Sequence, residues 1–309
     1  MSGLLQRLAL RLDASFNAKH AEPFKRGWAA TSRDDVSFFE TDRVLFRYRL
    51  VDGPAGASTI VFSADPPVSL EQYDDLLELA SRDFRVVVFE LPGMGFSPGK
   101  RRFRFGFEET NDEVAKFLRE IAGQDACLAF SCGAGLAAVD IANRHSDLAG
   151  SLVLIQTADV ASFARWKQDR DPKGVLAKPI VGQYAMRRIA RDRMPDWFKL
   201  ALGRSDHEPS FCGCSGQAMD EGALWSLASA YQVYLRPDLN LAPVGQPVLS
   251  LWGETDGSHP PEHHASTRNL AHTITERKFE DLGHFPELQE PGRVYPVIRD
   301  WLLSLSRQA

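Results

Sequence analysis

The sequence is poor in cysteine and lacks long apolar runs. It has four cysteines in 309 residues, at Cys127, Cys132, Cys212 and Cys214. They have neither the density of a disulfide framework nor the spacing of a structural zinc site. The longest apolar stretches, such as residues 85–89, are far shorter than the roughly 20 residues that a membrane span needs. We therefore expect a reduced, cytoplasmic protein that does not engage a membrane.

An excess of basic residues is also missing. The chain carries 36 Lys and Arg against 41 Asp and Glu, a formal net charge of −5. Proteins that bind duplex DNA are usually basic, so nucleic acid is not an expected partner. Aromatic residues are plentiful, with 19 Phe, 6 Trp and 6 Tyr. That much apolar surface is typical of a folded chain with a sizeable core rather than of a disordered one.

Short strand-like runs alternate with helical patterns through much of the chain. Strands are predicted at 36–40, 44–50, 58–62, 84–89, 126–130, 150–155, 247–252 and 273–279. Helices are predicted at 74–81, 110–121, 133–144 and 294–306. Uncharged strands between helices indicate a mostly parallel central sheet with helices on both faces, an α/β fold.

The alternation stops between residues 158 and 242, which are mostly helical and interrupted by prolines. We expect residues 1–157 and 243–309 to form the α/β core and 158–242 an inserted helical cap. Residues 158–205 carry 11 Lys or Arg against 5 Asp or Glu. This excess indicates solvated helix faces or, alternatively, a surface that meets an anionic partner.

The first residues read as an amphipathic helix. Leu4, Leu5, Leu8 and Leu12 recur at helical spacing. We expect this face to pack on the body of the protein, with a dimer contact as the alternative.

The strongest chemical signal is Ala129-Phe-Ser-Cys-Gly133, where a strand runs directly into a helix. Ser131 lies at the junction, and the residues two before and two after it are small, as a sharp turn requires. The turn places the Ser131 hydroxyl at the carboxyl end of a strand, where open α/β sheets bind ligands. The Cys132 amide then lies at a helix N-terminus, where it faces an oxyanion formed at Ser131.

In this segment the sequence resembles the α/β-hydrolase superfamily. A second match is Phe89-Glu-Leu-Pro-Gly-Met-Gly-Phe-Ser97, with Glu90 where Asp is usual. The resemblance implies the α/β-hydrolase fold and a serine nucleophile at Ser131. It also implies no metal and no organic cofactor.

Two further segments continue the resemblance. Trp252-Gly-Glu-Thr-Asp256 follows a buried strand and offers Asp256 as the triad acid, with Glu254 and Asp159 as rivals. His284 follows Gly283 after the last strand, where the superfamily keeps its general base. The order Ser131, Asp256, His284 is the superfamily's order.

The neighbouring cysteine and the other histidines are predicted to play no chemical part. A nucleophile at Cys132 would need a small residue at position 130, and Phe130 stands there. His259, His263 and His264 lack the helical spacing of zinc-protease ligands, so a solvated loop is expected.

Asp65 marks a departure from the superfamily pattern. It follows the strand 58–62 where the usual His-Gly segment leads to the second oxyanion amide. Its N–H would then complete the oxyanion hole with that of Cys132, although a carboxylate there opposes a developing negative charge. Its side chain would alternatively hold a substrate amine or hydroxyl, act as an extra acid or base, or cap the turn at Pro66-Pro67.

These features together predict a hydrolase that forms an acyl-enzyme on a small, partly apolar ester, thioester or lactone. The substrate is expected to be anionic or bound to a carrier protein. Alternatives are a slow binding protein on the same scaffold, or a lyase or rearrangement enzyme that uses the same pocket. The candidate substrate contacts are Ser63, Phe130, Trp166, Trp197, Trp225 and Phe285.

Overall fold

The structure is a computed structural model that describes residues 2–24, 35–203 and 206–307. An eight-stranded sheet forms its centre, in the order β1-β2-β4-β3-β5-β6-β7-β8. The strands are β1 (Val36–Glu40), β2 (Leu45–Val51), β3 (Thr59–Ala64), β4 (Arg85–Glu90), β5 (Ala126–Ser131), β6 (Ala149–Ile155), β7 (Val248–Gly253) and β8 (Ile274–Phe279). β1 and β2 are antiparallel to their neighbours, and from β4 to β8 every pair is parallel.

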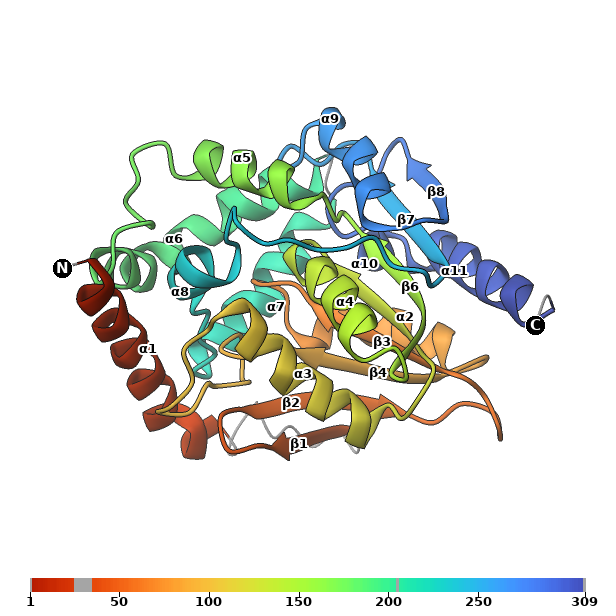
Figure 1. Cartoon of the computed structure of the whole chain (residues 1–309), viewed down its shortest axis with the longest axis horizontal. Helices are drawn as coiled ribbons and strands as arrows, with labels where there is room; N and C mark the ends of the chain where they lie inside the picture. Colours follow the sequence, from red (N-terminus) through yellow and green to blue (C-terminus); the bar gives the residue numbers. More distant parts are fainter. Residues whose placement is uncertain (1, 25–34, 204–205, 308–309) are drawn as a thin grey trace.

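Helices cover both faces of this sheet (Figure 1). The core helices are α2 (Asp74–Ala80), α3 (Phe107–Ile121), α4 (Gly133–Arg144), α9 (Pro261–His264), α10 (Pro286–Gln289) and α11 (Pro291–Ser306). Apolar residues of α3 and α4 pack with Leu128 and Phe130 of β5 on one face. Those of α2 and α11 pack with Cys127 and Ala129 on the other. The predicted α/β fold is confirmed, because alternate residues of one strand enter two separate cores.

The segment between β6 and β7 contains α5 (Val160–Arg170), α6 (Val181–Leu202), α7 (Glu208–Asp220), α8 (Leu227–Ser229) and a π-helical turn (Ala230–Tyr234). Figure 1 shows α5, α6 and α8 gathered on one side of the sheet, between α1 and α9. In the part of the chain that the structure describes, no helix combines the length and the apolar character needed to cross a membrane.

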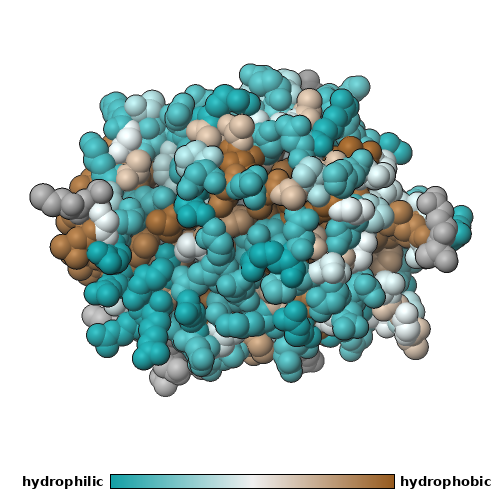
Figure 2. Space-filling view, in the orientation of Figure 1, coloured by the Kyte–Doolittle hydropathy of each residue, from teal (hydrophilic) through white to brown (hydrophobic). Residues whose placement is uncertain are grey.

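The N-terminal helix α1 (Ser2–Phe24) packs through a different face from the predicted one. Leu4, Leu5, Leu8 and Leu12 are all exposed, and Figure 2 shows apolar side chains at the surface where α1 begins. The buried face holds Ala9, Leu10 and Ala14 together with Asp13, which pairs with Arg187 and accepts from Ser229. The prediction of the packing face was wrong, because small side chains and the Asp13–Arg187 ion pair, rather than the leucine stripe, face the body of the protein.

A buried charge cluster holds the loop that follows β4. Arg47 is fully buried and pairs with Glu90 at 3.1 Å and with Glu71. The Glu90 carboxylate also accepts the Phe96 N–H at 2.7 Å. A Cβ at Gly95, where φ is +56°, would lie 2.6 Å from this carboxylate. The loop of the motif at residues 89–97 therefore folds closely around the Glu90 side chain.

This cluster predicts a pH-dependent stability. Burial raises the pKa of Glu90 from 4.5 to about 7, although Arg47 opposes the shift. A raised carboxyl pKa favours folding below the unfolded value and loses that contribution as pH rises through the folded value. We expect the free energy of unfolding to fall by up to about 3 kcal/mol between pH 4.5 and 7.5. Urea titrations should show this slope in the wild type and a clearly smaller one in Glu90→Gln; equal slopes contradict it.

Candidate active site

The turn between β5 and α4 places Cys132, not Ser131, at its strained position. Cys132 has φ 53° and ψ −129°, while Ser131 is still the last residue of the strand. A non-glycine residue rarely adopts positive φ, and such strain concentrates at functional sites. In strand-to-helix turns of this kind the strained residue is the one that projects its reactive atom from the sheet edge.

Ser131 points away from the predicted site. The alternation of β5 directs it to the face covered by α2, α10 and α11, where its Oγ donates to Glu287 Oε1 at 3.3 Å. Its N–H donates to Ser63 Oγ at 3.2 Å, and only 1% of the residue is exposed. The expectation that its hydroxyl faces the cavity beside His284 is therefore wrong.

Cys132 lines the main cavity instead. Its Sγ lies 3.7 Å from His259 Nε2, and the ligand atoms of Cys132, His259 and His284 all lie within 4.8 Å of one another. Its own N–H donates to the Ile155 carbonyl at 2.8 Å, which corrects the expectation that this amide serves an oxyanion. The Gly133 N–H, one residue on, faces the Cys132 sulfur and offsets a small part of the rise that burial causes in the pKa of that thiol.

Phe130 does not obstruct this turn. Its ring is fully buried and packs edge-to-face on Phe89, with centroids 5.5 Å apart. It enters the core under α3 and α4, so its bulk lies away from the turn at Cys132. The argument from its size against a thiol nucleophile was therefore wrong, because a strand residue can place a large side chain in the core below the turn.

His284 and Asp256 form the hydrogen-bonded pair that the motifs predict. His284 Nδ1 lies 2.6 Å from Asp256 Oδ2, which also accepts from Gln156 Nε2 at 3.0 Å. The other Asp256 oxygen accepts from the Ser258 N–H and hydroxyl at 2.7 and 2.6 Å. Burial raises the pKa of Asp256, but His284 and these donors bring it below its ordinary value. Asp256 is therefore an ionised carboxylate that holds the His284 ring.

The two rival acids lie elsewhere. Glu254 pairs with Lys278 at 3.2 Å on the surface. Asp159 caps α5 by accepting the Ser162 N–H at 2.7 Å. Within the described ranges neither carboxylate is hydrogen-bonded to His284, so Asp256 is the acid that the fold places beside the histidine.

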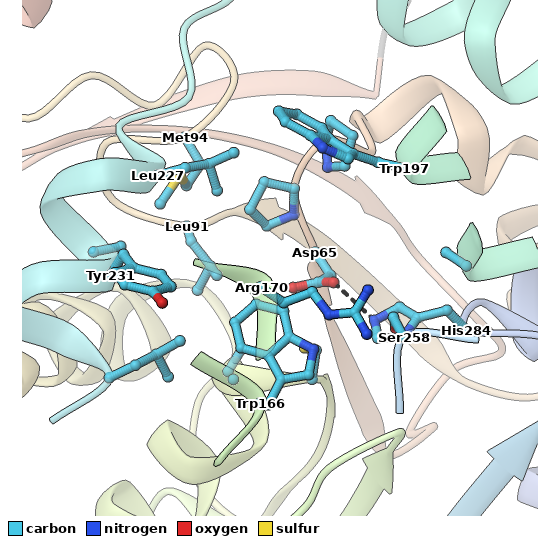
Figure 3. Close-up of a pocket in the computed structure, with 18 of the residues that line it drawn as sticks. Asp65, Leu91, Met94, Trp166, Arg170, Trp197, Leu227, Tyr231, Ser258 and His284 are labelled. Atoms are coloured by element: carbon cyan, nitrogen blue, oxygen red, sulfur yellow. Dashed lines mark hydrogen bonds and ion pairs between the residues drawn. The ribbon is translucent and has the colours of Figure 1, made fainter. Parts of the chain in front are cut away.

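Asp65 turns its carboxylate toward the same ring. Its Oδ2 lies 3.2 Å from His284 Nε2 (Figure 3), while its main-chain oxygen accepts the Val68 N–H at 2.9 Å. Burial raises the pKa of Asp65, and the contact with His284 opposes that shift. The carboxylate therefore acts on the histidine rather than as a simple cap of the turn at Pro66-Pro67.

Burial and charge set the protonation of the three central groups. Burial lowers the pKa of His284, but Asp256, Cys132 and Asp65 together raise it well above 6.5. Burial raises the pKa of the Cys132 thiol to about 11, and it lowers the pKa of His259 to about 3. At rest the thiol is thus largely neutral, His284 is largely an imidazolium and His259 is an uncharged imidazole.

The predicted solvated loop of histidines is wrong. His259, His263 and His264 are 1%, 2% and 4% exposed. The His259 ring stacks between Trp166, at 5.9 Å, and His284, at 5.3 Å, with interplanar angles of 11° and 17°. Sequence reasoning missed His259, and the available signal was its position after β7, at the sheet edge where β5 also ends.

The cavity measures about 290 Å³ and is mainly apolar. Of the predicted contacts, Trp166, Trp197 and Phe285 line it. The others do not: Trp225 is outside the lining, Ser63 contacts Ser131, and Phe130 lies in the core. Among the described residues, Cys132, His259 and His284 form the one group of three whose metal-binding atoms lie within 4.8 Å of one another.

Comparisons with known proteins agree with this architecture. Residues 66–291 match the family described as alpha/beta hydrolase fold. A curated relative is the biotin biosynthesis bifunctional protein BioHC of Teredinibacter turnerae, 24% identical over 250 residues, which are 74% of this chain and 40% of that protein. The chain therefore spans less than half the length of that relative.

Solved structures of the same fold include an esterase from Thermogutta terrifontis, with a TM-score of 0.69 and 18% identity, covering 89% of this chain and 99% of that one. An epoxide hydrolase from Bacillus megaterium has a TM-score of 0.67 and 17% identity, with coverage of 86% and 99%. At these identities the likeness shows the fold alone. Because the family match spans well over half of the sequence, the chain belongs to the α/β-hydrolase family.

Proposed function

We propose that this protein is an acyl hydrolase in which Cys132 is the nucleophile, His284 the general base and Asp256 the residue that orients it. The observation that carries the proposal is the strained turn that exposes Cys132 to the cavity beside the His284–Asp256 pair. The serine of the sequence-based hypothesis is replaced by the adjacent cysteine. The reaction class, acyl transfer from an ester, thioester or lactone, stays as predicted.

The chemistry follows from these positions. After its own Nε2 proton has left to solvent, His284 takes the thiol proton as the Cys132 sulfur attacks the carbonyl carbon of the substrate. The C–S bond forms, the tetrahedral oxyanion collapses, and the leaving group departs with the proton from His284. Water, deprotonated by the same ring, then attacks the thioester, and the released Cys132 thiolate regains its proton. The Asp256 and Asp65 carboxylates hold the resting His284 as an imidazolium, so the reaction starts only from the protein in which this ring has lost its Nε2 proton.

With Cys132 as the nucleophile, the main-chain N–H groups that bind the oxyanion also differ from the predicted ones. The Gly133 N–H, at the N-terminus of α4, replaces that of Cys132, and the Asp65 N–H supplies the second donor. Each donor of this kind contributes about 10²- to 10³-fold in rate. The Asp65 carboxylate is drawn to His284 Nε2, which directs its charge toward the histidine.

The cavity favours an acyl group with an apolar body and an anionic end. Its walls include Leu91, Met94, Trp166 and Met186. Arg170, at the end of α5, also lines it, and Figure 3 shows its side chain directed toward the side that holds Asp65 and His284. Within the described ranges no hydrogen bond or ion pair engages Arg170, so its guanidinium is available to a substrate carboxylate.

Arg170→Ala should raise KM about tenfold for an ester whose acyl chain ends in a carboxylate, because one exposed charge-assisted hydrogen bond is lost. KM for the uncharged analogue of the same length should change little. Arg188→Ala, which removes an exposed arginine of α6 outside the cavity lining, is the matched control. Equal losses on both esters would contradict the assignment of Arg170.

Trapping the acyl-enzyme tests the nucleophile directly. Wild-type protein mixed with an activated medium-chain ester and quenched in acid should gain one acyl group on the peptide that contains Ser131 and Cys132. Neutral hydroxylamine should remove this group rapidly, since it cleaves thioesters much faster than oxygen esters. A hydroxylamine-resistant adduct assigned to Ser131 by fragmentation would overturn the proposal, and so would turnover with no adduct in wild type and full rates in Cys132→Ala.

A further inference from the structure

Three loops bring metal-binding atoms together beside the cavity, whose lining includes Cys132 and His284. Cys132 comes from the β5–α4 turn, His259 from the segment after β7, and His284 from the segment after β8. Their ligand atoms lie within 4.8 Å of one another, and all three residues are buried. The proposed reaction uses Cys132 and His284 but gives no task to His259.

The spacing matches one tetrahedral zinc ion. Zn–S bonds of about 2.3 Å and Zn–N bonds of 2.0–2.1 Å place sulfur and nitrogen ligands about 3.5 Å apart. The distance from Cys132 Sγ to His259 Nε2 is 3.7 Å, so little movement is needed. The cavity reaches Cys132 and His284, which leaves the fourth position open to it.

The surrounding contacts orient both rings. His284 Nδ1 is hydrogen-bonded to Asp256 Oδ2 at 2.6 Å, and His259 Nδ1 is hydrogen-bonded to His263 Nδ1 at 3.4 Å. Each ring is therefore held through one nitrogen and presents Nε2, the arrangement by which outer contacts aim metal ligands. The parallel stack of the two rings, anchored on Trp166, holds them in this orientation.

The carboxylate of Asp65, which also lines the cavity, is a candidate for the open fourth position. Asp65 Oδ2 lies 3.2 Å from His284 Nε2, close to the separation of two ligands on one zinc ion. Sulfur, imidazole and carboxylate together favour a borderline-soft cation over magnesium or calcium, which prefer oxygen ligands alone.

We infer that Cys132, His259 and His284 form a zinc site whose occupation blocks the proposed acyl transfer, because the ion binds both the attacking sulfur and the basic nitrogen. Its inhibitory effect rests on the proposed function, whereas binding itself does not. On binding, the Cys132 thiol proton and the Nε2 proton of the His284 imidazolium are released to solvent, and Zn–S and Zn–N bonds form with no change of oxidation state.

Cobalt(II), added to the chelator-treated full chain, is the spectroscopic probe. We expect one equivalent to give a near-ultraviolet thiolate-to-cobalt band and visible bands typical of tetrahedral coordination. Cys132→Ala should lose the thiolate band. His259→Gln, close in size to the ring it replaces, should weaken zinc binding at least about tenfold in competition with a chromophoric chelator, since even outer-shell losses cost 10- to 100-fold.

His272→Ala, an exposed histidine outside the cavity lining, is the control and should bind zinc as wild type does. Circular dichroism and the thermal midpoint show whether each variant is folded, and a variant that fails this test is replaced by His259→Asn. Absence of the thiolate band, or zinc affinity unchanged in both His259 variants, overturns the site. Zinc that binds at Cys132 and leaves turnover intact overturns the inhibition.

The outcomes separate the two proposals. A thiolate–cobalt band in a protein that turns over no ester would support the metal site and reject the proposed hydrolase. An acyl adduct on Cys132 without that band would do the reverse.

Discussion

Cys132→Ala is expected to lower kcat/KM for an activated ester by at least about 10³-fold, whereas Ser131→Ala should stay within about tenfold of wild type. Removing a nucleophile abolishes the covalent route and leaves only binding and the oxyanion donors. Ser131 lies outside the cavity lining, and its hydroxyl contacts Glu287. Its loss should instead cost about 1–3 kcal/mol of stability, because a buried carboxylate oxygen loses its donor.

Steady-state kinetics and urea unfolding of both variants measure these two effects separately. Cys127→Ala is the matched control, since it removes a buried thiol from β5, the strand that leads to Cys132, and its side chain lies in the core under α2 and α11. It should keep its activity. An inactive Ser131→Ala beside an active Cys132→Ala would restore the serine triad that the motif alone predicts.

Gly253→Ala is expected to destabilise the fold by about 3 kcal/mol and to lower kcat about 100-fold in the protein that remains folded. A Cβ at Gly253 would lie 2.0 Å from the Gly283 carbonyl oxygen and 2.5 Å from that of Leu282. Both are main-chain atoms, so the two segments must separate. These segments carry Asp256 and His284, whose 2.6 Å contact then lengthens.

Gly292→Ala provides the contrast. Gly292 lies in α11, its φ is not positive, and a Cβ there meets nothing within 4 Å. Alanine should be neutral or stabilise by about 0.5–1 kcal/mol through helix propensity. Thermal unfolding and ester turnover of the pair test the idea, and a Gly253→Ala protein with wild-type midpoint and rate would refute it.

Local patterns in the sequence determined most of the core. The predicted strand at 36–40 and helix at 133–144 coincide with β1 and α4, and the other core elements agree within a few residues. They succeed because hydrophobic period and glycine or proline boundaries are local properties. The pairing of Asp256 with His284 was also predictable, since both follow strands that end at the same edge of a parallel sheet.

The packing of α1 required the tertiary structure. The leucines define an apolar stripe along the helix, but such a stripe does not determine which face of α1 packs on the rest of the protein. Ala9 and Ala14 allow the closer contact, and Asp13 is held there by Arg187, a partner 174 residues away.

Which of Ser131 and Cys132 faces the cavity was likewise decided by the tertiary structure. Adjacent residues at a strand-to-helix turn point in different directions, so a shift of one position moves the reactive atom from cavity to core. The sequence determined that a hydroxyl and a thiol stand side by side at the end of β5, with an acid and a histidine to follow. Only the folded chain decided which of them faces the cavity, because the backbone turns left-handed at Cys132 and Glu287 engages Ser131 from the opposite face of the sheet.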